Sequence, residues 1–95
     1  MSDDKLIKRL EELIAKGETV LSTLEGNQVG GTVNNDIFQE WRVGSLSLLQ
    51  KVFGKDSAIP EEFKDRCNDK YFVEAETGLS ILKAAKEELK AGDIF

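Results

Sequence analysis

The most informative segment of the chain is Asp36–Ser57, with the sequence DIFQEWRVGSLSLLQKVFGKDS. At about 100° per residue, one half of a helix collects its large apolar side chains, which are Ile37, Phe38, Trp41, Leu46, Leu48, Leu49, Val52 and Phe53. Arg42 falls within the same half. Because an uncompensated charge in an apolar setting is costly, the pattern predicts a buried helix face on which the Arg42 guanidinium meets an acidic partner.

A first helix is expected at about 3–24, before this segment. Ser2 is placed to act as an N-cap, and the two aspartates that follow it suit the positive end of the helix dipole. A 4-3 spacing along the helix links Leu6, Leu10, Leu13, Gly17, Val20 and Leu24. Gly17 lies on this apolar row, which predicts a close approach by another helix.

The remaining helices have clear start and stop signals. The second helix is expected over 36–53, capped by Asn35 or Asp36 and ended by a glycine. A proline in the first turn, followed by two glutamates, predicts a short helix over 60–67. The last helix is expected over 72–91, with Gly92 as its C-terminal stop.

These elements predict one all-α domain over 1–95. Three long helices are expected to pack as an antiparallel bundle, with the short helix closing one end. Gly78 on the last helix is small and is expected to allow close packing against the row that carries Gly17. Glu74, at the edge of the apolar side of the same helix, is the candidate ion-pair partner of Arg42.

Composition limits the classes of function. Thirteen basic and eighteen acidic residues give a formal charge of −5, which disfavours direct nucleic-acid binding. No apolar stretch approaches the roughly 20 residues that cross a bilayer, and the single cysteine has no partner for an internal disulfide. We therefore expect a cytoplasmic protein without a membrane segment or cofactor. The glycine- and asparagine-rich run at 26–35 lacks a phosphate-loop ending and is expected to be a surface loop.

No catalytic or metal-binding apparatus is recognisable in the sequence. The chain has no histidine to activate Cys67, and the acids beside this thiol disfavour its ionised form. Trp41 has two interpretations, a core anchor or an interface anchor. Arg42 also has two, a structural pair with Glu74 or a cleft residue that binds an acidic ligand.

The segments FQEWRVGSLSLLQKVFGKDS and FVEAETGLSILKAAKEELKAG, residues 38–57 and 72–92, carry a family resemblance. They resemble a small helical module at the N-terminus of many uncharacterised bacterial proteins, some of which have predicted nucleotide-binding, TIR-like or nuclease domains linked to phage defence. The resemblance implies an accessory domain that recognises a partner or assembles subunits, with any catalysis housed elsewhere. The apolar end at Ile94 and Phe95 likewise suggests a polypeptide that continues.

The sequence therefore predicts a non-catalytic interaction or assembly module. Its expected partner is protein, either another copy in a homodimer or a downstream domain. The alternative is a regulatory module that binds a small ligand or anion through Arg42 in a cleft.

Overall fold

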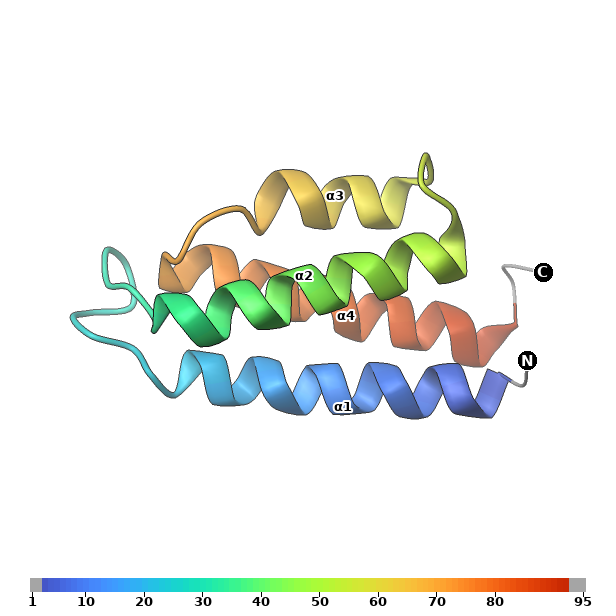
Figure 1. Ribbon diagram of the computed structural model, residues 1–95, viewed down its shortest axis with the longest axis horizontal. Helices are drawn as coiled ribbons and strands as arrows, with labels where there is room; N and C mark the ends of the chain where they lie inside the picture. Colours follow the sequence, from blue (N-terminus) through green and yellow to red (C-terminus); the bar gives the residue numbers. More distant parts are fainter. Residues whose placement is uncertain (1–2, 93–95) are drawn as a thin grey trace.

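The computed structural model describes residues 3–92 and contains four helices (Figure 1). They are α1 (Asp3–Leu21), α2 (Asn35–Phe53), α3 (Ala58–Arg66) and α4 (Phe72–Ala91). Residues 3–92 contain no strand, so the predicted all-α class, with three long helices and a short one, is confirmed. The expected roles of Ser2, Ile94 and Phe95 lie outside the described residues.

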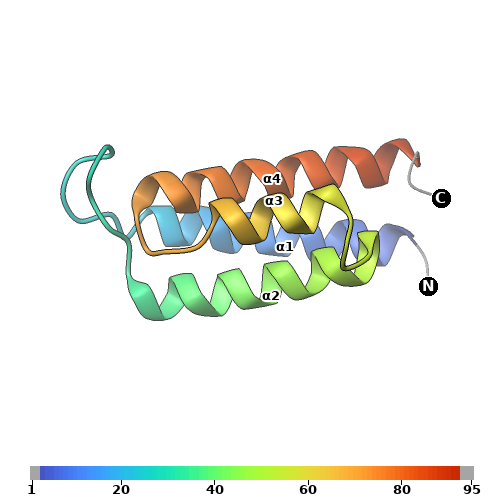
Figure 2. The same ribbon diagram turned by 90° about the horizontal axis from the view of Figure 1, so that it is seen from above.

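The helices run alternately up and down, with α2 and α4 between the other two (Figures 1 and 2). α1 packs on α4 and α2 from one side, and α3 packs on the same two helices from the other side. The prediction that the short helix closes one end of the bundle is therefore wrong. α3 lies along the side of the bundle because its buried residues, Pro60 and Phe63, pack where α3 meets α2 and α4.

α1 ends at Leu21, three residues before the predicted end. The hydroxyls of Ser22 and Thr23 donate hydrogen bonds of 2.6 Å to the carbonyl oxygens of Thr19 and Val20. Such local bonds satisfy carbonyls at the end of a helix and compete with its continuation. The apolar spacing beyond Leu21 thus continues in a turn and not in the helix.

The N-cap of α2 is Asn34, and not Asn35 or Asp36 as predicted. The Asn34 side-chain oxygen accepts a hydrogen bond of 3.1 Å from the backbone N–H of Ile37, which satisfies one of the unpaired donors of the first turn. Asp36 instead lies within that turn, where its charge suits the helix dipole. The predicted stop at Gly54 is confirmed, with φ of 94°.

The other boundaries agree closely with the sequence. α3 begins at Ala58, two residues before the predicted start, and Pro60 lies in its first turn. α4 has the predicted bounds and is followed by its C-cap Gly92, whose left-handed φ of 73° is readily adopted by glycine.

The connection between α1 and α2 is an ordered loop. Glu25 and Thr32 exchange two backbone hydrogen bonds of 2.8 and 3.0 Å, and the Thr23 hydroxyl oxygen accepts 2.8 Å from the Asn34 N–H. The loop is also joined to the start of α4, because Phe72 N–H donates to the Gly31 carbonyl at 3.0 Å. These bonds hold together the end of the bundle at which α2 and α4 begin.

Candidate functional site

An apolar groove runs between α1 and α2. It has a volume of about 510 Å³ and is bordered by Arg9, Leu13, Lys16, Thr19, Val20, Ile37, Glu40, Trp41, Val43 and Gly44. Its floor is aliphatic and aromatic, and its polar residues stand along the two edges. A concave apolar surface with a few placed polar groups is the usual form of a binding site, so this groove is the candidate site.

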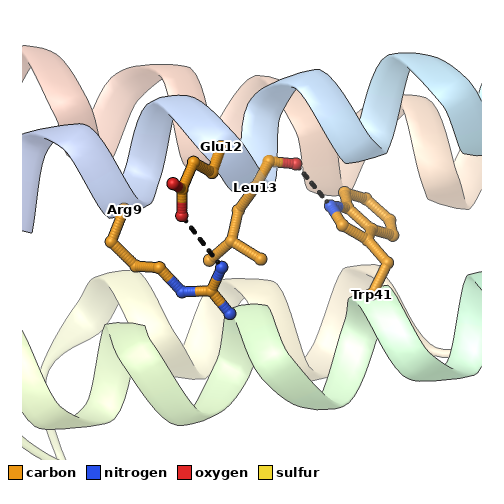
Figure 3. A network of polar contacts seen from close by, with 4 residues as sticks. All are labelled: Arg9, Glu12, Leu13 and Trp41. Atoms are coloured by element: carbon orange, nitrogen blue, oxygen red, sulfur yellow. Dashed lines mark hydrogen bonds and ion pairs between the residues drawn. The ribbon is translucent and has the colours of Figure 1, made fainter.

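Trp41 forms the floor of the groove and is also part of the core. It is 2% exposed, and its indole N–H donates a hydrogen bond of 2.8 Å to the carbonyl oxygen of Leu13 on α1 (Figure 3). Its ring lies 6.0 Å from the Phe63 ring in an edge-to-face arrangement and 6.1 Å from the Phe38 ring. The core interpretation of Trp41 is confirmed, and the indole links three helices.

Two glycines set how closely the helices approach at this site. A Cβ atom at Gly17 would lie 2.9 Å from both the Trp41 ring and a Leu79 methyl, so the predicted close packing at Gly17 is confirmed. At Gly44, by contrast, a Cβ atom would meet nothing nearer than a Leu13 methyl at 3.9 Å. Gly17 is thus required by packing, whereas Gly44 keeps the groove open.

The two edges of the groove carry opposite charges. On the α1 edge, Arg9 forms an exposed ion pair of 3.2 Å with Glu12 of the same helix (Figure 3), which contributes little to stability. Lys16 on this edge and Glu40 on the α2 edge are both exposed. Neither of them joins an ion pair within residues 3–92. Val43, also on the α2 edge, is 60% exposed.

Arg42 and Glu74 do not form the direct ion pair that the sequence predicted. The Arg42 Nε–H donates 2.6 Å to the carbonyl oxygen of Cys67, whereas a Glu74 carboxylate oxygen accepts from the N–H groups of Asn68 and Asp69 at 2.9 and 2.8 Å. The Cys67 carbonyl and the Asn68 N–H belong to one peptide group. The two charges therefore hold the two sides of this peptide at the end of α3.

The position of α3 explains this difference. α2 and α4 have little direct contact with each other, whereas α3 packs against both of them. The residues that were expected to meet across α2 and α4 instead meet the segment that follows α3. The half-buried Arg42 side chain finds its acceptor at a helix C-terminus, where the exposed carbonyl oxygens favour a cation.

Gly78 lies against α3 and not against the row that carries Gly17, so its predicted partner helix is wrong. A Cβ atom at Gly78 would lie 2.5 Å from the Cys67 sulfur and 3.2 Å from the Phe63 ring. Cys67 is itself fully buried. Burial raises the pKa of its thiol from 9.0 to about 12, while the nearby Arg42 charge lowers it and the Glu74 charge raises it. The thiol is therefore protonated and inaccessible near neutral pH, in agreement with a structural role.

Sequence reasoning missed the groove and the buried Ser45. The groove depends on Gly44 and on the spacing of two helices, neither of which a single helical pattern reveals. Ser45 is fully buried, and its hydroxyl has no hydrogen-bond partner. Within residues 3–92, no three His, Cys, Asp or Glu side chains gather where they could bind a metal ion. None of the four described helices combines the length and apolar composition that a bilayer crossing needs.

Comparisons with protein-family models, with curated proteins and with solved structures found no match to the chain.

Proposed function

We propose that this chain is a non-catalytic helical interaction module that binds an amphipathic protein helix in the groove between α1 and α2. In this proposal it is an accessory domain of a cytoplasmic, bacterial multidomain protein. The observation that carries the proposal is the apolar floor of the groove between two edges of opposite charge. Recognition of a helix in a groove has this form, with apolar anchors inside and charges at the edges.

The groove is suited to a helix because two antiparallel helices line it along its length. A third helix can place its apolar ridge between them, as helices do in bundles. Each large apolar side chain that is fully buried contributes about 1.5–3 kcal/mol. Three such anchors would supply a gross free energy of about 4.5–9 kcal/mol, from which the entropic cost of association is subtracted.

The non-catalytic part of the proposal rests on Cys67 and Arg42. Burial and a raised pKa keep the Cys67 thiol from acting as a nucleophile. The Arg42 Nε–H is engaged by the Cys67 carbonyl, so the guanidinium serves the connection between α3 and α4. No observation favours the alternative in which Arg42 binds a small ligand.

A model peptide tests the groove directly. The probe is an amphipathic helical peptide of leucine, glutamate and lysine, and the readout is the fluorescence of Trp41, the single tryptophan, at low protein concentration. We expect a saturable change for the wild-type chain. Gly44→Glu places a charge in the groove without a clash at Cβ and is expected to weaken binding at least about tenfold, or about 1.4 kcal/mol.

The matched control is Ala84→Glu, which adds the same charge at an exposed position of α4. It is expected to bind the peptide as the wild-type chain does. Equal binding by Gly44→Glu and Ala84→Glu, or no saturable change in the wild-type chain, would contradict the proposal.

A further inference from the structure

We propose that the partner of this groove is a second copy of this chain, whose own α1–α2 face covers it in a dimer with the two-fold axis along the groove. This inference rests on the proposed function and names its partner. A two-fold interface uses the same surface on both copies, so the surface must be complementary to itself. The face made by α1 and α2 meets this condition in its charges.

The charges at the two edges lie at nearly the same height along the groove. Trp41 of α2 packs on Gly17 of α1, and Gly44 of α2 lies closest to Leu13 of α1. Lys16 and Glu40 are each one residue from the first of these contacts, on antiparallel helices. They therefore face each other across the groove as unlike charges that form no ion pair within residues 3–92.

A two-fold axis along the groove superimposes these charges between copies. The rotation places α1 of one copy over α2 of the other and leaves the position of every residue along the groove axis unchanged. Each Lys16 then lies over the partner's Glu40, so the same ion pair forms twice. An axis across the groove would instead place α1 over α1, with the two cationic edges together. Charge complementarity thus selects one orientation as well as one partner.

The exposed apolar surface fits the same arrangement. Val43 is 60% exposed on the α2 edge, at a point where a monomer leaves it in water. In the dimer, the α2 edge lies over the partner's α1, so Val43 is covered by the partner's α1. Association therefore removes the exposed part of Val43 from water on both copies, and burial of apolar surface is the main driving force for such interfaces.

Charge reversal with mixing tests this geometry. In Lys16→Glu both edges are acidic, and in Glu40→Lys both are basic, so each homodimer places like charges together at both contacts. Each exposed ion pair contributes modestly, but in each variant two attractive contacts become repulsive. The dimer dissociation constant of each variant alone, measured by sedimentation equilibrium, is therefore expected to rise at least about tenfold above the wild-type value. In an equimolar mixture, unlike charges meet at both contacts, and dimerisation is expected to return to the wild-type level.

Lys8→Glu and Glu87→Lys serve as matched controls, because both residues are exposed and lie outside the groove. Alone or mixed, they are expected to dimerise as the wild-type chain does. This inference is overturned if reversing the groove charges leaves dimerisation unchanged. It is also overturned if the equimolar mixture does not dimerise as the wild-type chain does.

A wild-type chain that stays monomeric at 10.6 kDa at all concentrations also overturns this inference. If it still binds the model peptide through the groove, the proposed function survives with a different partner. If it binds neither, both proposals fail.

Discussion

Alanine at position 17 and alanine at position 44 are expected to change the stability of the chain in opposite directions. Both substitutions replace a helical glycine by the best helix former, which favours the helix by about 0.8–1.0 kcal/mol. The effect is full at Gly44, in the middle of α2, and is at most this large at Gly17, in the last part of α1. The two sites differ in what the new methyl group meets.

The expected magnitudes follow from these contacts. A methyl at position 44 has its nearest neighbour at 3.9 Å, which is ordinary van der Waals contact, so Gly44→Ala is expected to gain about 0.5–1 kcal/mol. A methyl at position 17 would lie 2.9 Å from the rigid, buried ring of Trp41. Overpacking of this kind costs about 1–3 kcal/mol. Gly17→Ala is therefore expected to lose up to about 2 kcal/mol overall.

Urea unfolding followed by far-ultraviolet circular dichroism measures both free energies, at one protein concentration low enough to keep the chains monomeric. The two variants should differ by about 1–3 kcal/mol, which corresponds to roughly 4–8 °C in Tm per kcal/mol for a domain of this size. Equal stabilisation by the two substitutions would refute the packing of α1 on Trp41.

Three further predictions concern the buried groups. Arg42→Met and Glu74→Gln are each expected to cost about 1.5–3 kcal/mol, as for hydrogen bonds to charged groups, and to be non-additive in a double-mutant cycle because they hold the same peptide; additive losses would contradict the shared contact. Cys67 stabilises the fold fully below pH 9.0 and loses this contribution as pH rises toward about 12, because the unfolded thiol ionises first. Unfolding measured across this range should therefore show a steeper alkaline decline in the wild-type chain than in Cys67→Ala, and identical slopes would contradict the raised pKa. Trp41→Phe removes the N–H bond to Leu13 and is expected to cost at least about 1 kcal/mol in urea unfolding; an unchanged midpoint would argue against that bond.

The sequence was sufficient for the elements whose signals are local. Helical periodicity located α1, α2 and α4, Pro60 with the two glutamates after it located α3, and glycine at positions 54 and 92 located two of the C-terminal ends. The burial of Trp41 and the close packing at Gly17 also followed from their place on apolar rows. These features depend on one helix at a time, or on side-chain volume alone.

The rest depended on contacts between helices. The position of α3 along the side of the bundle depends on which helix faces remain uncovered once α1, α2 and α4 pack together. The hydrophobic pattern of a single helix does not contain this information. For the same reason, Arg42 and Glu74 were assigned to each other, although both bind the peptide after α3. The groove was missed because an absent side chain, at Gly44, helps to create it.

Nuclear magnetic resonance of the unmodified chain tests most directly whether the face of α1 and α2 is the binding surface. The measurement is the dependence of the amide chemical shifts on protein concentration. We expect the shift changes with rising concentration to concentrate at the groove, above all at Lys16, Glu40, Gly44 and the Trp41 indole N–H. Shifts confined to α3 and α4, or no change at any concentration, would contradict this expectation.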